Sequence, residues 1–293
     1  DESHSDAWFA VAQWTLPIDS RGKQKMPDMI QASKSMGAIR KVVELDPHNE
    51  HAWRIGGEIL VGHLGMLEHG LEWWESRKGV APTDIYPYFE QVSILIRLGY
   101  FDKAGEYLDI LDGVIESQPN KSLETRARRI RAIFDEQNSM EEELSFEPQN
   151  NKDDSWGLIR RMRKKKPITE TYFLLMFVMP IVFLLGSAAM VIFASFPYST
   201  AIVMLLIIGM YFGIARLSRR LLLKLNRPES FLNRAIDIET SSGKVCIPAE
   251  IRESKLYSHI VGRRTPAFQE RIGLIQESSE PLPRKWSLQI PDL

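Results

Sequence analysis

The chain has 293 residues, and its formal net charge of −1 hides two oppositely charged parts. Residues 1–150 carry 16 Lys and Arg against 26 Asp and Glu, whereas residues 151–293 carry 21 against 12. The acidic part lacks the clustered cations that a phosphate backbone requires, which argues against nucleic acid as a partner. The single cysteine, Cys246, excludes an intramolecular disulfide and agrees with a reducing compartment.

Residues 1–138 contain helix–turn–helix units at a regular spacing. Gly65 and Gly99 mark two tight turns that lie 34 residues apart. Pro47, Pro82 and Pro119 recur behind the units at intervals of 35 and 37, where proline ends a helix because it lacks an N–H. We expect units at 51–84 and 85–119, an earlier unit with helices at 6–16 and 32–45, and a final helix at 121–137. Such units bury a continuous core by stacking.

This pattern resembles the tetratricopeptide repeat over residues 6–137. In that family a small residue after the turn lets two helices approach closely, and Gly70 and Ala104 occupy that place here. The resemblance implies a superhelix whose concave groove holds a peptide or a helix of a partner, although several groove residues would equally serve as packing between units. The groove residues lie on the first helix of each unit: Ile55, Ile59, Gly62, His63, Tyr86, Phe89, Ser93, Ile96 and Arg97.

Two adjacent tryptophans, Trp73 and Trp74, fall on the second helix of the best-matching unit. One of them must fill the core between helices. The other is either buried as well or exposed as an anchor for a partner protein.

Residues 139–170 read as an acidic linker followed by a basic juxtamembrane segment. Glu141–Glu143 and the polar run 149–155 predict a solvated linker. Residues 156–163 mix apolar side chains with arginines, which predicts a short interfacial helix with Trp156 at headgroup depth. A plain basic stop before the membrane is the alternative.

Residues 171–215 contain no charged residue, no histidine and no side-chain amide over 45 positions. A hydrocarbon core takes roughly 20 helical residues to cross, so this length predicts two transmembrane helices, at 172–195 and 200–222, within a hairpin at 171–224. The turn falls at 196–200, and Pro180 should kink the first helix. Gly186, Gly209 and Gly213 are small enough to pack the two spans together or to dock on another protein's spans.

Basic residues flank the hairpin on both sides, while its turn carries no charge. Because Lys and Arg near span ends stay on the cytoplasmic side, we expect both termini in the cytoplasm of a bacterium or on the equivalent side of an organelle membrane. Together with Trp156, these residues form the predicted membrane-surface set: Arg160, Arg161, Arg163, Lys164, Lys165, Lys166, Arg216, Arg219 and Arg220.

Six prolines interrupt the tail at 225–293. We expect a short helix at 228–239, short strands at 244–247 and 256–261, and otherwise an extended cytoplasmic segment that becomes ordered against a partner.

The predicted fold class is therefore all-α: a solenoid similar to tetratricopeptide repeats, two transmembrane helices and an irregular, mostly extended tail. No motif for catalysis, a metal or a cofactor is present, so we expect a non-enzymatic adaptor or scaffold. It would bind partner proteins at the cytoplasmic face and help to assemble or stabilise a membrane complex. The alternative is an accessory subunit of a large membrane assembly whose repeats are structural packing. A third hypothesis is an enzyme with its site in the tail, at Lys244, His259, Arg263 and Arg264.

Overall fold

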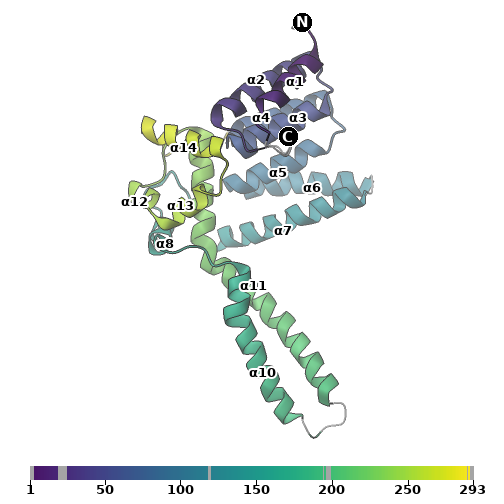
Figure 1. The fold of residues 1–293 in the computed structure, drawn as a ribbon, viewed down its shortest axis with the longest axis vertical. Coiled ribbons are helices and arrows are strands. Elements are labelled where there is room, and N and C mark those ends of the chain that lie inside the picture. The colour runs from purple at the N-terminus through teal and green to yellow at the C-terminus, as the bar shows by residue number, and fades with distance from the viewer. Residues whose placement is uncertain are drawn as a thin grey trace.

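The computed structural model of the chain describes residues 3–18, 25–117, 120–193, 195, 199–288 and 290, and its regular elements are all helices. A helical body carries a long two-helix hairpin that projects from it (Figure 1). The body contains helices from both ends of the chain, whereas the hairpin comes from the middle. One hydrophobic core joins the helices from the two ends of the chain, because it includes buried side chains from Ala12 through to Leu288.

The N-terminal half of the body is a stack in which each helix contacts the next one along the chain. The predicted helices at 6–16, 32–45 and 121–137 are present, and the last two are longer than expected. Asp28 explains the earlier start of the second helix, because its carboxylate accepts from the Gln31 N–H and the Gln31 side chain accepts from the Asp28 N–H. The stack consists of α1 (Ser5–Thr15), α2 (Met29–Leu45), α3 (Glu50–Gly57), η1 (Glu58–His63), α4 (Leu67–Val80), α5 (Tyr86–Leu98), α6 (Phe101–Ser117) and α7 (Lys121–Glu143).

The two predicted turn glycines sit at the turns between antiparallel helices. Gly65 has φ +66° and Gly99 has φ +86°, a left-handed backbone that favours glycine. The small residues after the turns also lie where helices approach closely. A Cβ on Gly70 would come within 2.6 Å of the Val61 side chain, and Ala104 is fully buried. These positions therefore have the geometry that the spacing predicted.

The hairpin has two arms, and both are long and apolar enough to cross a membrane. The first arm runs without a break through α9 (Glu170–Phe173), η2 (Leu174–Val178) and α10 (Met179–Ile192). The distortion expected at Pro180 takes the form of η2, a π-helical turn directly before it. The second arm is the start of α11 (Ser199–Ser242), and most of the predicted turn between the arms lies outside the described residues.

The helix α11 is continuous over 44 residues and contains Pro228 in its interior. The helix predicted to end near residue 222 therefore continues, and residues 228–239 are helical as expected but belong to α11 instead of forming a separate helix. The end of the membrane-spanning part of α11 stays a prediction. Proline removes one backbone hydrogen bond, but helices of the body surround this stretch. From Phe231 to Ser241 only Asn233 is not fully buried. The same helix thus forms one arm of the hairpin and the centre of the body (Figure 1).

The tail is folded, so the prediction of an irregular, mostly extended tail is wrong. It forms α12 (Ala249–Arg252), α13 (Lys255–Val261) and α14 (Pro266–Ser278). The strand expected at 256–261 is helical because Ser254 caps it, its Oγ accepting from the Tyr257 N–H at 3.1 Å. Of the strand expected at 244–247, only a single bridge from Val245 to Pro281 exists among the described residues.

Of the predicted solvated linker, residues 149–154 are exposed or half-buried as expected, but the segments on both sides of them pack on the body. α7 continues to Glu143, and a short helix, α8 (Ser155–Met162), follows it. Phe146 and Trp156 are buried, and the Phe146 ring lies 4.9 Å from the Phe231 ring of α11. The segment between the stack and the hairpin is therefore attached to the central helix, because its aromatic side chains gain more from burial than its polar residues lose.

Candidate functional site

The predicted groove residues separate into a buried and an accessible group. Ile59, Phe89 and Ile96 are buried in the core. For these three the alternative of packing between elements is correct, because their side chains are at most 6% exposed and belong to the core, although Ile59 also contributes to a pocket wall. Fewer of the predicted groove residues are therefore accessible to a partner than the resemblance implies.

Some of the accessible groove residues line a pocket at the N-terminal end of the stack. Its volume is about 290 Å³, and the π-helix η1 forms part of its wall; π-helical turns occur frequently at functional sites. Nδ1 of His63 is buried with no hydrogen-bond partner among the described residues, and burial lowers the pKa of His63. The pocket is lined by both apolar and polar side chains, with Glu58 and the His63 imidazole among the polar ones. Its lining residues are Gln13, Leu16, Ile18, Ile55, Glu58, Ile59 and His63.

Other predicted groove residues contact the chain itself. The Tyr86 ring lies between the guanidinium groups of Arg54 and Arg126, at 4.6 and 4.5 Å from its centroid. Burial raises the pKa of Tyr86. Ser93 donates to the carbonyl of Phe89 in its own helix at 2.8 Å. Because Arg126 belongs to α7, this helix covers the part of the groove around Tyr86.

Arg97 joins the stack to the central helix. Its guanidinium donates to both carboxylate oxygens of Asp237 in α11, at 3.0 and 2.9 Å. Arg264, just before α14, donates to the same carboxylate at 3.0 Å. Burial lowers the pKa of Arg97, but the charge and hydrogen bonds of Asp237 outweigh this effect and the net shift is upward. Three segments of the chain therefore meet at one buried carboxylate, beside a cavity of about 440 Å³ between α5, α7 and α11.

The C-terminal helices dock on the two turns of the stack. A Cβ on Gly65 would lie 2.4 Å from the Phe268 ring of α14, and one on Gly99 would lie 2.9 Å from the Arg234 guanidinium of α11. Each glycine thus serves both the turn and the contact with the tail. The sequence contained the signal for the turns, but the docking residues lie more than 130 positions away and carry no local signal.

We expect Gly99→Ala to lower the free energy of unfolding by about 1–2 kcal/mol, because a Cβ is strained at positive φ and displaces Arg234. Chemical denaturation in detergent measures this. Gly113→Ala is the matched control, since nothing lies within 4 Å of a Cβ there and Gly113 is inside α6. The control should leave stability unchanged or raise it by about 0.5–1 kcal/mol; equal losses in both variants would contradict the docking at Gly99.

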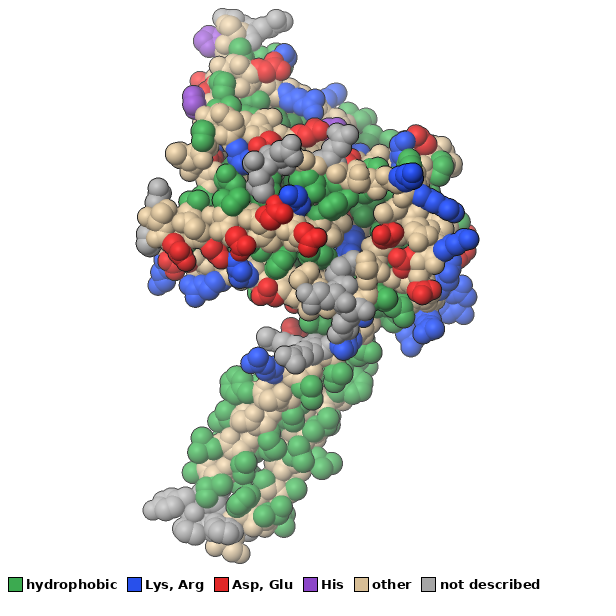
Figure 2. All heavy atoms as spheres, turned by 180° about the vertical axis from the view of Figure 1, so that it is seen from behind, with side chains coloured by type: hydrophobic (Ala, Val, Ile, Leu, Met, Phe, Trp, Pro, Cys, Tyr) green, Lys and Arg blue, Asp and Glu red, His purple; other side chains and the backbone are tan. Residues whose placement is uncertain are grey.

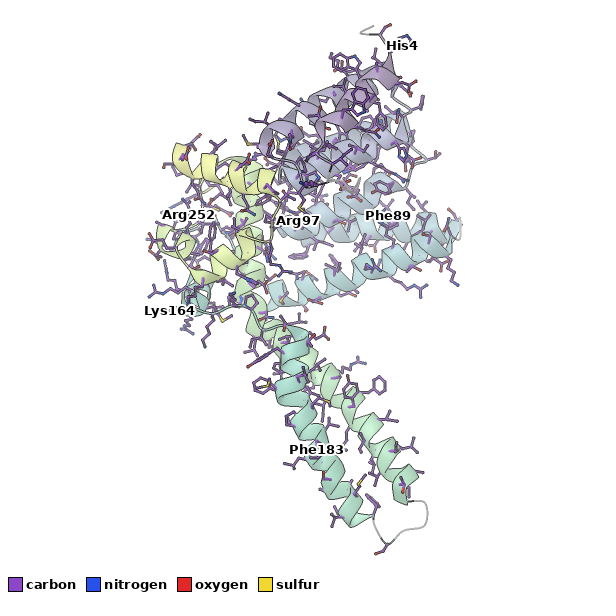
Figure 3. The ribbon with its side chains drawn as sticks, viewed as in Figure 1. His4, Phe89, Arg97, Lys164, Phe183 and Arg252 are labelled. Carbon is purple, nitrogen blue, oxygen red and sulfur yellow. The ribbon has the colours of Figure 1, made fainter. Side chains whose placement is uncertain are left out.

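The predicted membrane-surface residues lie where the hairpin leaves the body. Figure 3 shows Lys164 at this level. Arg160 forms an ion pair with Glu250 at 2.7 Å, and Arg216 is exposed. The remaining basic residues at the end of α8 and directly after it are exposed: Arg161, Arg163, Lys164, Lys165 and Lys166. The side chains of Arg219 and Arg220 lie outside what the structure describes.

The Trp156 side chain is buried in the body and is not available to lipid headgroups. It is 0% exposed and packs edge-on against the Phe146 ring at 5.2 Å. Ile159 of the same helix is equally buried. The apolar face of α8 therefore points into the body, and the interfacial role predicted for Trp156 is wrong, because α8 packs on the central helix and on Phe146 instead.

Only one of the three predicted small residues packs the hairpin arms together. A Cβ on Gly186 would lie 3.0 Å from the Ile207 side chain of the other arm. Nothing lies within 4 Å of a Cβ on Gly209 or Gly213. Gly209 and Gly213 therefore have open space beside them, and docking on the spans of another protein stays a prediction for these two glycines.

Neither tryptophan of the adjacent pair serves as an exposed anchor. Trp73 and Trp74 are both buried. Trp73 lies over Gly56 and Trp74 over Gly57, where a Cβ would come within 2.4 and 2.1 Å of the rings. The expectation of an exposed anchor at this pair is wrong, because two consecutive glycines in α3 make room for both rings.

Several polar groups of the tail have structural partners. Glu239 is 0% exposed, and one of its oxygens accepts from the N–H groups of Cys246 and Ile247, at 3.0 and 2.9 Å. Burial raises the pKa of the Cys246 thiol well above its usual value, so the thiol is not poised as a nucleophile. Lys244 forms an ion pair with Glu280 at 2.7 Å. Among the described residues, no group of three or more His, Cys, Asp or Glu side chains could hold a metal ion.

No family model, no curated protein and no solved structure matches the chain. The resemblance to tetratricopeptide repeats thus depends on the spacing of Gly65, Gly99 and the three prolines.

Proposed function

We propose that the chain is a membrane-anchored adaptor, whose hairpin spans a membrane and whose body binds a partner protein on one side. The continuity of α11 is the observation that carries this proposal. One helix of 44 residues begins as an apolar arm and ends as the buried centre of the body. Figure 2 shows the contrast between the apolar surface of the hairpin and the charged surface of the body. Because one helix belongs to both parts, the orientation of the hairpin in a bilayer would set the orientation of the body.

The proposed orientation places the body in the cytoplasm or on the equivalent side of an organelle membrane. Basic residues gather at the body end of both arms, which is where the positive-inside rule retains them. The helices before and after the hairpin share one core, so they lie on the same side of any membrane that the hairpin crosses. The partner-binding solenoid and both termini would then be cytoplasmic.

The proposed contact for a partner is the accessible part of the predicted groove. The pocket beside Ile55 and His63 stays open, whereas α7 and α11 cover the remainder. Its apolar side chains lie beside an imidazole nitrogen that has no hydrogen-bond partner among the described residues, which suits an apolar side chain of a partner next to a hydrogen-bonding group. This restricts partner binding to a smaller set of residues than the sequence predicted.

Co-purification in mild detergent tests the adaptor. The full chain should bring down a partner in stoichiometric amount, and Ile55→Glu should lose it because a second carboxylate beside Glu58 would be desolvated under the partner's apolar side chain. Leu274→Glu is the matched control, because Leu274 is exposed on α14 and outside the pocket. A chain that binds nothing, or a partner lost equally in both variants, would count against the proposal.

The accessory subunit of a membrane assembly is the second candidate function, and the open surroundings of Gly209 and Gly213 favour it. Small residues permit close contact between helices in lipid. Replacing both glycines by isoleucine should release membrane subunits under this hypothesis and leave the pocket-bound partner in place. Deleting residues 1–150 cannot separate the two hypotheses, because α4 and α5 cover the buried face of α11.

A further inference from the structure

The base of the body, on the side that carries the hairpin, is strongly basic. Figure 2 shows Lys and Arg side chains gathered along this edge, above the apolar hairpin. We call this surface the basic base. It consists of exposed side chains in the last turn of α8, directly after α8 and at the start of α13: Arg161, Arg163, Lys164, Lys165, Lys166 and Lys255.

The structure holds the basic base in a fixed place. The carbonyl of Arg163 accepts from the N–H groups of Lys255 and Leu256, at 2.9 and 3.4 Å, which joins the run to α13. At its other end, Ile168 exchanges two hydrogen bonds with the side chain of Asn226 in α11, at 3.1 and 2.8 Å. The cations are therefore pre-arranged by elements of the tail and of the central helix, and less ordering is needed when they bind.

The nearby acids neutralise only a small part of this charge. Glu250 pairs with Arg160, which is not one of the six residues of the basic base. Glu253, between α12 and α13, is the other exposed acid of the adjoining tail segment. An excess of positive charge therefore remains on the surface, and a ligand for it must be anionic.

The distance to the membrane is short enough for the headgroups. Lys166 is four residues from Glu170, where the apolar arm starts, so their Cα atoms lie at most about 14 Å apart. An extended lysine side chain spans several ångströms of this, and charges interact over a Debye length of about 8 Å at physiological salt. The apolar face of α8 is buried, so this helix contributes charge and no insertion into the bilayer.

We propose that the basic base docks on anionic phospholipid headgroups of the bilayer that the hairpin enters. This proposal rests on the proposed insertion of the hairpin. Docking holds the body against the membrane by electrostatic attraction, in addition to the anchoring by the two arms. Anionic lipid thereby sets the tilt of the body, since α11 joins both parts rigidly.

Amine labelling of the full chain in lipid nanodiscs tests the docking. Discs of phosphatidylcholine alone are compared with discs that also contain phosphatidylserine, and mass spectrometry follows each lysine. A surface potential of about −30 mV concentrates protons about three-fold, so Lys164–Lys166 and Lys255 should react at least about three-fold more slowly in the anionic discs. High salt should remove the difference. Lys34, exposed on α2, is the internal reference.

Each other outcome contradicts a different part of the proposal. Equal labelling in both discs, with the hairpin still protected from protease, would overturn the docking and leave the insertion intact. Equal slowing by inorganic phosphate in discs without phosphatidylserine would identify a site for free anions instead of lipid. A chain that does not enter discs would overturn the proposed function as well.

A charge-reversed variant gives an independent readout. With Lys164→Glu, Lys165→Glu and Lys166→Glu, labelling of Lys255 should become equal in the two kinds of disc. Lys121→Glu, a substitution at an exposed position at the start of α7, should leave the difference at Lys255 unchanged. Loss of the difference in both variants would contradict a localised docking surface.

Discussion

Asp237→Ala should lower the free energy of unfolding by about 3 kcal/mol, because it leaves two buried or half-buried guanidinium groups without their carboxylate. Asp237 is 3% exposed and receives hydrogen bonds from both Arg97 and Arg264. Each arginine retains some contact with water, so the loss lies near the lower end of the range for a broken buried pair. Urea denaturation in mild detergent, followed by circular dichroism, measures it.

The control for Asp237 is a surface ion pair. Glu106 pairs with Lys103, and both side chains are nearly half exposed. Glu106→Gln should change stability by less than about 1 kcal/mol, because solvent screens such pairs. Similar losses in the two variants would show that Asp237 does not join the stack, the central helix and the tail. A loss at Asp237 that disappears when Arg97 and Arg264 are also replaced by methionine would support the network.

Trp156→Ala should lower the free energy of unfolding by about 4 kcal/mol, because it removes a fully buried ring and leaves a cavity next to Phe146 and Phe231. A tryptophan at headgroup depth would behave differently. Its loss would leave the body intact and alter only the affinity for the bilayer. Thermal unfolding in detergent, where no bilayer is present, separates the two expectations.

Trp14→Ala is the matched control, because the Trp14 side chain is 84% exposed at the end of α1. This substitution should change the free energy of unfolding by no more than about 0.5 kcal/mol. A Trp156→Ala variant as stable as the Trp14→Ala variant would contradict the burial of α8 against the central helix.

The hairpin and the turns of the stack were predictable because their signals are local. An uncharged run at residues 171–215 is a property of composition alone, and both arms of the hairpin follow it. Gly65 and Gly99 were predictable because a left-handed turn favours glycine whatever surrounds it. The start of α13 had a local signal as well, the cap at Ser254, but the many prolines of the tail outweighed it in the prediction.

The errors share one physical cause, which is burial by distant segments. The residues around Trp156 have a composition typical of a membrane interface. Within the protein, however, Trp156 packs on Phe146, which stacks on Phe231 of α11. Pro228 has the local signature of a helix end, but α11 continues through it within a body where other helices pack on it. The candidate groove was overestimated for the same reason, since Ile59, Phe89 and Ile96 look exposed until the remaining helices are placed.

The sequence by itself determined that this chain is helical, that it carries an apolar hairpin, and that basic residues surround the base of that hairpin, because each of these depends on residue type and spacing. Only the tertiary structure decided that the N-terminal stack and the tail form one body around α11, with Arg97 and Arg264 meeting at Asp237. The physical reason is that Arg97 and Asp237 lie 140 positions apart in the chain, so no local pattern links them. In the sequence, each of these charged side chains looks like an ordinary surface charge. The surrounding helices exclude water and so make it part of a buried network.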